Sequence, residues 1–159
     1  MSFFTMQLLV RLITSAAGSC AFALIFKTHR RHLFRIGLAG LITYFIYHTV
    51  MYLGGGFFVA SFASTVFAAA FGEMCARLFR APALIYNLTA LIPIVPGGEA
   101  YYTMRYLLER DMPRANEKLL ATIGVALGIA GGIVLVSLVV GVIGDRVARK
   151  QGGNHGGKH

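Results

Sequence analysis

The chain has 159 residues, of which 57% are hydrophobic and only 13% are charged, and its mean hydropathy is +0.68. A soluble domain carries about twice that share of charged residues, so the composition excludes an ordinary soluble protein and indicates an integral membrane protein. The net charge of +9 does not indicate nucleic-acid binding, because the basic residues lie in short blocks between apolar runs.

Five apolar segments follow one another along the chain and nearly exhaust it. They lie at residues 3–26, 36–52, 57–78, 81–98 and 119–144. A transmembrane helix needs about 20 apolar residues, so the predicted fold class is an all-α integral membrane bundle of about five spans. We expect this single domain to cover residues 1–144 and a basic, disordered tail to cover residues 145–159.

The first segment contains Arg11 close enough to one membrane surface for its side chain to reach the headgroups. The small residues from Ser15 to Ala23 resemble a signal-peptidase site, but no basic stretch precedes them, so we expect the segment to remain as the first span. Cys20 and Cys75 lie in apolar runs at no metal-ligand spacing and are interpreted as small buried residues.

The second and third segments each carry one titratable residue of interest. His48 shares a helical face with Tyr44 and Tyr47; it could relay a proton, or it could simply lie at the interface where tyrosines collect. Glu73 is an intramembrane carboxylate, which could carry a proton or face a substrate ammonium. The alternative, which we prefer, is an ion pair with Arg77 four residues later. Three glycines at 54–56 predict a turn between the two segments.

The fourth segment breaks its own helix at Pro93, Pro96, Gly97 and Gly98, and Glu99 follows. Each proline removes an amide donor, and the glycines are expected to permit positive φ and close backbone approach. Irregular backbone at membrane depth persists only where protein or a water-filled cavity surrounds it, and such broken helices form substrate sites in transporters. An ordinary turn at the membrane surface, with Glu99 as an N-terminal helix acid, is the alternative.

The fifth segment contains Gly124, Gly128 and Gly132 at four-residue spacing. Because apolar surface gives helices no reason to associate in lipid, small residues that let backbones approach closely mark a packing face. We expect this stripe to dock on another helix, either in this chain or in a partner.

The distribution of basic residues predicts the topology. An outside N-terminus would place ten of the 15 Lys and Arg residues on the inner side and five on the outer side, which favours N-out and C-in for five spans. The sequence leaves open whether the broken segment crosses the membrane or re-enters it.

The run LTALIPIVPGGEAYYTM, Leu88 to Met104, resembles the signature of the bacterial threonine/serine exporter family, particularly its small, separately encoded membrane subunit. In that family an apolar run leads into I-P-x-x-P-G and then a stretch such as A-Y-x-A-M. The matching residues here are Ile92, Pro93, Pro96, Gly97, Ala100, Tyr101 and Met104. The chain length, the basic block after the first span and the Pro82 loop also fit, so the resemblance extends over most of the chain.

The resemblance implies the membrane subunit of a secondary exporter in the bacterial inner membrane, working with a larger membrane subunit or as a homo-oligomer. Its substrate would be threonine and serine, or a C4-dicarboxylate such as succinate, with export driven by protons. The candidate substrate-binding residues are Pro93, Pro96, Gly97, Gly98, Tyr101 and Asn87, with Arg105 added for a dicarboxylate. Proton coupling is placed at Glu73, Glu99 or His48. A non-transporting scaffold subunit is the rival interpretation.

The sequence contains no Ser, Cys or paired-carboxylate constellation, no phosphate-binding loop and no metal-ligand spacing. We therefore expect no enzyme activity and no cofactor.

Overall fold

The structure is a computed structural model, and it describes the backbone of residues 2–26, 28, 30–79 and 82–152. It describes the side chains of residues 6, 8–26, 28, 33–79 and 82–143. The described elements are all helical: α1 (Ser2–Ile25), α2 (Arg30–Tyr52), α3 (Gly56–Phe79), α4 (Ala83–Leu91), the 3-10 helix η1 (Ile92–Ile94), α5 (Gly97–Leu108) and α6 (Met112–Gly152). The predicted all-α membrane bundle is confirmed.

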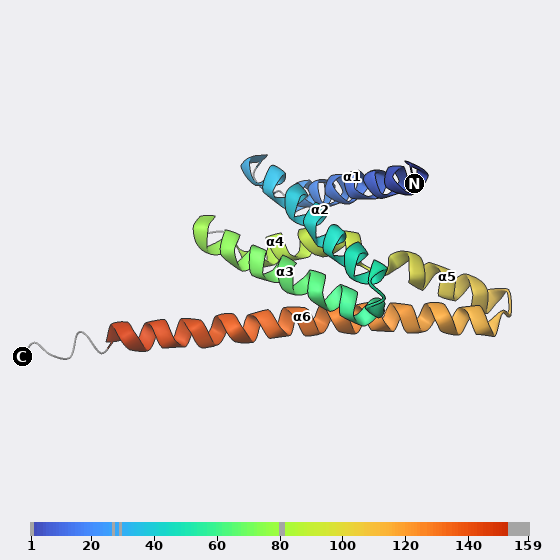
Figure 1. Cartoon of the computed structure of the whole chain (residues 1–159). Coiled ribbons are helices and arrows are strands. Elements are labelled where there is room, and N and C mark those ends of the chain that lie inside the picture. Colours follow the sequence, from blue (N-terminus) through green and yellow to red (C-terminus); the bar gives the residue numbers. More distant parts are fainter. Residues whose placement is uncertain (1, 27, 29, 80–81, 153–159) are drawn as a thin grey trace, which may run out of the picture.

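The helices run back and forth, so that α1 begins and α6 ends at opposite ends of the bundle (Figure 1). The helices α1 and α2 pack together on one side, α3 and α4 lie in the middle, and α6 lies along α3 on the other side. Because α4, η1 and α5 run in the same direction, they form one interrupted traverse of the bundle.

Among the described residues, four helices are long and apolar enough to cross a membrane, over Leu8–Ile25, Leu33–Tyr52, Gly56–Phe79 and Met112–Ile143. The predicted fourth segment instead forms a shorter apolar helix over Ala83–Ile94. Its nine α4 residues and three η1 residues rise about 20 Å, at about 1.5 Å per α-helical and 2.0 Å per 3-10 residue, well short of a hydrocarbon core of roughly 30 Å. The helix therefore breaks before it has crossed a full bilayer.

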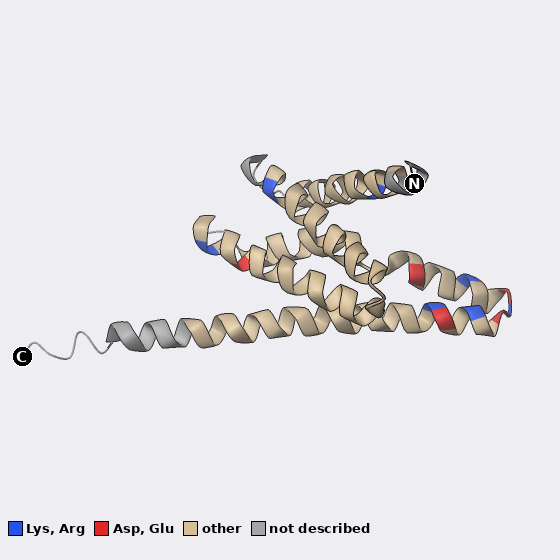
Figure 2. Ribbon diagram, viewed as in Figure 1, with Lys and Arg blue, Asp and Glu red and all other residues tan. Residues whose placement is uncertain are grey.

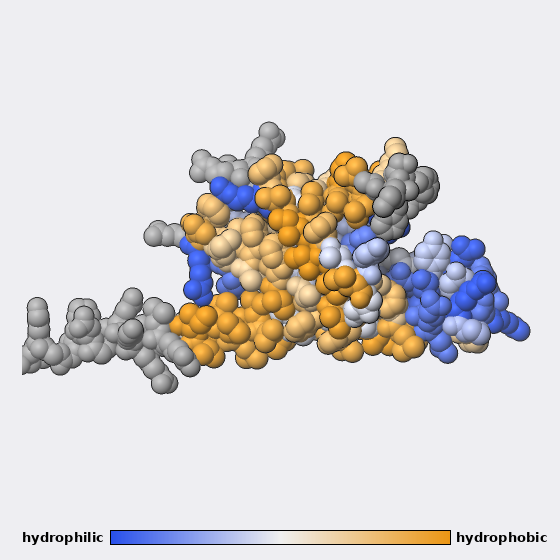
Figure 3. Space-filling view, viewed as in Figure 1, coloured by the Kyte–Doolittle hydropathy of each residue, from blue (hydrophilic) through white to orange (hydrophobic). Residues whose placement is uncertain are grey.

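The charged residues of the described chain gather at the two ends of the bundle, and the body between them is apolar (Figures 2 and 3). One end is a hydrophilic hairpin made of α5 and the beginning of α6. The predicted last segment was too short, because α6 begins at Met112 rather than at residue 119. Asp111 explains this start: its Oδ1 accepts a hydrogen bond from the amide of Arg114 at 3.3 Å, as a helix N-cap does, and Pro113 suits the first turn.

The tail beyond Gly144 was predicted to be disordered, and α6 continues as a helix to Gly152. The remaining tail, residues 153–159, lies outside the described residues.

The glycine stripe of α6 packs against α3. A Cβ added at Gly128 would lie 2.7 Å from the carbonyl oxygen of Phe58, and one added at Gly132 would lie 2.8 Å from Cβ of Thr65. Such closeness leaves space for glycine alone, and the backbones gain dispersion contacts in return. The stripe is therefore covered within this chain and does not present a free face to a partner.

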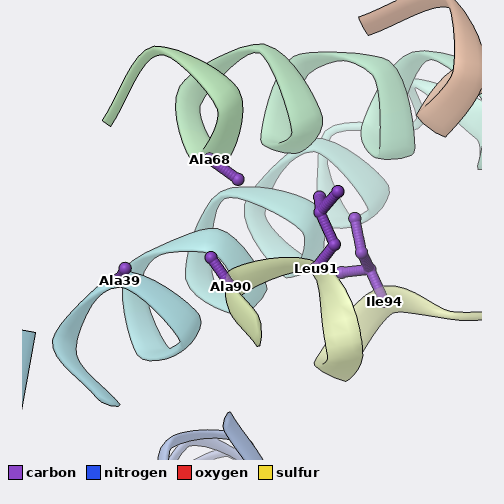
Figure 4. Packing of buried hydrophobic residues seen from close by; sticks show 5 residues of the cluster. All are labelled: Ala39, Ala68, Ala90, Leu91 and Ile94. Atoms are coloured by element: carbon purple, nitrogen blue, oxygen red, sulfur yellow. The ribbon is translucent and has the colours of Figure 1, made fainter. Parts of the chain in front are cut away.

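The broken segment is held in place by a small apolar cluster. Figure 4 shows Ala39 of α2, Ala68 of α3, Ala90 and Leu91 of α4, and Ile94 of η1 gathered where these helices meet. All five are at most 5% exposed. Three of them are alanines, so α2, α3 and α4 approach closely and fix where α4 ends.

Candidate functional site

The backbone of the break runs from η1 to the first turn of α5. The amide of Val95 donates to the carbonyl of Ile92 at 3.3 Å, and the amide of Gly97 donates to the carbonyl of Val95 at 2.8 Å. The next amide with a backbone acceptor is that of Ala100, which donates to Pro96 at 3.0 Å. Within the described chain, the amides of Gly98 and Glu99 have no acceptor, so the N-terminus of α5 offers two free donors.

Gly97 and Gly98 do not adopt the positive φ that glycine permits. Among the described glycines, only Gly54 and Gly56 have positive φ, at 82° and 69°, because they turn the chain between α2 and α3. Gly97 and Gly98 begin a regular helix, and apart from their chain neighbours and the backbone of their own helix, no atom of the described chain lies within 4 Å of the position of a Cβ at either. They therefore leave open space beside the break.

The break lines a cavity of about 150 Å³. Its walls come from α2, the break itself, the first turn of α5 and α6. The lining residues are Tyr47, Pro93, Ile94, Val95, Pro96, Gly98, Glu99 and Val125. Four predicted substrate-site or proton-coupling residues, Pro93, Pro96, Gly98 and Glu99, thus meet in one hollow.

Glu99 is the charged group of this cavity, and it forms an ion pair with Lys118 of α6. Oε2 of Glu99 lies 2.9 Å from Nζ of Lys118, and both side chains are about one-third exposed. The pair joins the first turn of α5 to α6, and it balances the carboxylate beside the two free amides. The cavity therefore combines amide donors that suit a carboxylate with a carboxylate that suits an ammonium.

Tyr101 and Arg105 lie on α5 but do not line this cavity. Tyr101 is 65% exposed and packs edge-on against Tyr102. Nε of Arg105 donates to Glu109 at 2.8 Å, and this bond raises the pKa of the Arg105 guanidinium, which stays charged. These two predicted contacts therefore point away from the break.

Asn87 also lies away from the cavity, on the face of α4 that packs against α3. Its side chain occupies the space that a Cβ at Gly72 would fill, and its Oδ1 is buried with no hydrogen-bond partner in the described chain. Thr89 donates to the carbonyls of Ile85 and Tyr86 within its own helix.

The other two proton-coupling candidates, Glu73 and His48, do not line the cavity at Glu99. No ion pair joins Glu73 to Arg77 in the described part of the chain, so the preferred interpretation of Glu73 is wrong; spacing of four residues brings two side chains within reach but does not fix their rotamers. The ring of His48 lies 6.3 Å from that of Tyr44 on α2.

Three residues at the site were not predicted from the sequence. Tyr47 was noted only as a neighbour of His48, and Val125 lies between two glycines of the packing stripe. Lys118 was counted only as a loop charge. Its pairing with Glu99 spans 19 positions and depends on the α5–α6 hairpin, so no local sequence pattern predicts it.

Metal binding has no support in the described residues, where no group of three or more His, Cys, Asp or Glu side chains could hold an ion.

Comparison with known proteins shows to which family the chain belongs. No curated protein and no solved structure matches the chain. The model of one family, described as "Threonine/Serine exporter, ThrE", matches residues 11–139. That range covers well over half of the chain and includes the break, the cavity and the glycine stripe. The chain therefore belongs to the threonine/serine exporter family and is a multi-pass membrane protein of a transporter family.

Proposed function

We propose that this chain is the membrane subunit of a proton-coupled exporter of threonine and serine, and that the amino acid binds at the break between α4 and α5. The observation that carries the proposal is the cavity at Pro93, Pro96, Gly98 and Glu99, where two amides lack acceptors. Its volume of about 150 Å³ suits a small molecule. The same hollow offers partners for both charged ends of an amino acid.

Binding would place the substrate carboxylate on the amides of Gly98 and Glu99, and the ammonium near the Glu99 carboxylate. Alternating access would then follow from rocking of the helices around the short α4, as in other transporters with broken helices. Glu99 is the best-placed proton carrier, because it lines the cavity while Glu73 and His48 do not. A C4-dicarboxylate such as succinate is the competing substrate, but the Arg105 that would favour it is engaged by Glu109.

The proposed setting is the bacterial inner membrane, with the N-terminus outside and the C-terminus in the cytoplasm. The beginning of α1 and the end of α6 lie at opposite ends of the bundle (Figure 1), which agrees with termini on opposite sides of the membrane, and the bias of Lys and Arg selects which side is cytoplasmic. The proposed partner is a larger membrane subunit of the same family, and a homo-oligomer is the alternative. Because α3 covers the glycine stripe, a partner would have to dock elsewhere.

Transport in proteoliposomes tests the proposed function directly. We expect vesicles containing the chain, with any subunit that co-purifies, to accumulate labelled threonine and serine when a proton gradient is imposed across their membrane. Pro96→Ala restores a donor and helical freedom, and Gly97→Leu fills the open space beside the break. Together they are expected to reduce transport at least tenfold while the complex stays assembled.

The matched control is Gly141→Leu, since Gly141 lies on α6 with no atom of the described chain within 4 Å of its Cβ position. Full transport with both Pro96→Ala and Gly97→Leu in an assembled complex would reject the binding site and favour the scaffold interpretation. Movement of succinate but not threonine would reassign the substrate.

Topology is tested separately by cysteine labelling in intact cells. A cysteine placed at Arg110, in the turn between α5 and α6, is expected to react with a membrane-impermeant maleimide from outside. Both native cysteines are first replaced by alanine. Labelling of this cysteine only after the cells are opened would show that the orientation is the reverse of the proposed one.

A further inference from the structure

A second cavity adjoins the break and was not anticipated from the sequence. It measures about 310 Å³ and is lined by Arg11, Thr14 and Ser15 of α1, Tyr44 of α2 and Pro93 of η1. Pro93 lines this cavity and the one at Glu99. The two hollows therefore adjoin the same turn of the broken segment.

Arg11 is the charged group of the second cavity. It lies in the candidate span Leu8–Ile25 of α1, and no carboxylate of the described chain forms an ion pair with it. The described ion pairs use other cations: Arg105 with Glu109, Arg114 with Asp111, and Lys118 with Glu99. An arginine in a membrane span is costly and marks a functional site unless it simply reaches the surface. The cavity beside the break favours the functional role.

The hydroxyl groups around Arg11 are arranged as acceptors. Thr14 donates to the carbonyls of Val10 and Arg11, and Ser15 donates to that of Leu12 at 2.8 Å. A hydroxyl that has given its proton to the backbone keeps lone pairs free, whereas a guanidinium offers only donors. The cavity therefore presents hydrogen-bond donors on Arg11 and acceptor oxygens on Thr14 and Ser15.

We infer that this second cavity is a second binding site for the exported amino acid, next to the site at the break, and that Arg11 binds the carboxylate there. Thr14 and Ser15 would accept hydrogen bonds from its ammonium or side-chain hydroxyl. This assignment rests on the proposed function. It follows from charge, because Lys118 already balances Glu99, so the uncompensated charge beside Pro93 is the guanidinium. A planar guanidinium also matches a carboxylate in two-point geometry.

Binding measurements with two ligands test the role of Arg11. The full chain, with any subunit that co-purifies, is placed in nanodiscs of phosphatidylcholine and titrated calorimetrically with L-threonine and with 1-amino-2-propanol, which lacks the carboxylate. We expect Arg11→Gln to weaken threonine binding at this second site about tenfold or more, the loss typical of one charge-assisted bond. Binding of the amine should not weaken. Arg11→Lys, which keeps the charge but not the two-point geometry, should give an intermediate loss for threonine.

The matched control is Arg77→Gln, an exposed arginine at the end of α3 that lines neither cavity. It should leave threonine binding unchanged. If Arg11→Gln does not fold, the intermediate loss in Arg11→Lys still tests the assignment.

Three results would overturn the inference. Equal threonine affinity in wild type, Arg11→Gln and Arg11→Lys would reject it, while transport by the wild type would leave the proposed function intact. An equal loss of affinity for 1-amino-2-propanol would show that Arg11 does not bind the carboxylate. If Arg11→Gln leaves threonine binding unchanged but abolishes the stabilisation that phosphatidylglycerol nanodiscs give to the wild-type protein, Arg11 binds a lipid phosphate instead. Absence of both threonine binding and transport in the wild type would instead reject the proposed function.

Discussion

Gly128→Leu is expected to separate α6 from α3 and to lower the free energy of unfolding by about 3 kcal/mol or more. A Cβ at Gly128 would lie 2.7 Å from the carbonyl oxygen of Phe58 and 3.0 Å from the amide nitrogen of Phe62. Both are backbone atoms, so no side-chain rotation relieves the overlap. The measurement is the thermal and denaturant unfolding of the purified chain in detergent, followed by size-exclusion chromatography.

Gly141→Leu controls for the added apolar volume on the same helix, because open space surrounds Gly141. It is expected to unfold like the wild type. Equal stability of the Gly128 and Gly141 variants would mean that the glycine stripe does not hold α6 against α3.

Lys118→Met is expected to destabilise the α5–α6 hairpin by about 1–2 kcal/mol and to reduce threonine transport severalfold. Removing one partner leaves the Glu99 carboxylate uncompensated beside the cavity, and an unpaired charge costs more than the pair contributes. The magnitude is well below that of a fully buried pair, because both side chains are about one-third exposed. Unfolding and proteoliposome transport are measured on the same preparations.

The double variant Glu99→Gln, Lys118→Met separates the two roles of Glu99. It should recover most of the lost stability, since no unpaired charge remains, but it should not recover transport if Glu99 carries the proton. Glu109→Gln breaks an ion pair of similar length between Arg105 of α5 and the C-cap residue of that helix, and it should change neither quantity, because that pair is solvent-exposed. Recovery of full transport in the double variant would remove Glu99 from the mechanism.

Several features of the protein follow from local sequence alone. Apolar runs near the thickness of a bilayer determine the spans, and two prolines three residues apart prevent a continuous helix between α4 and α5. The glycines of α6 predict close packing, because small residues at four-residue spacing form one stripe whatever helix they meet. The family resemblance rests on the same short motif, and the family match over residues 11–139 agrees with it.

Other features were predicted incorrectly where local rules compete. Gly97 and Gly98 were expected to permit positive φ, but Pro96 precedes them and they begin a helix, where their lack of a side chain matters more than their backbone freedom. The Glu73–Arg77 pair was expected from spacing, yet spacing restricts side chains only loosely. The beginning of α6 was placed too late, although Asp111 and Pro113 signal it in the sequence.

Which residues surround the break depended on how distant helices meet. Tyr47, Glu99, Lys118 and Val125 come from three helices, and Arg11 of the first helix lines a cavity together with Pro93. Local periodicity says which side of a helix is apolar, but not which residue of another helix it will face. That choice follows from the close contacts of Gly128 with α3 and of Ala68 with Ala90. These contacts set the depth at which each helix lies, and so decide which charges surround the break.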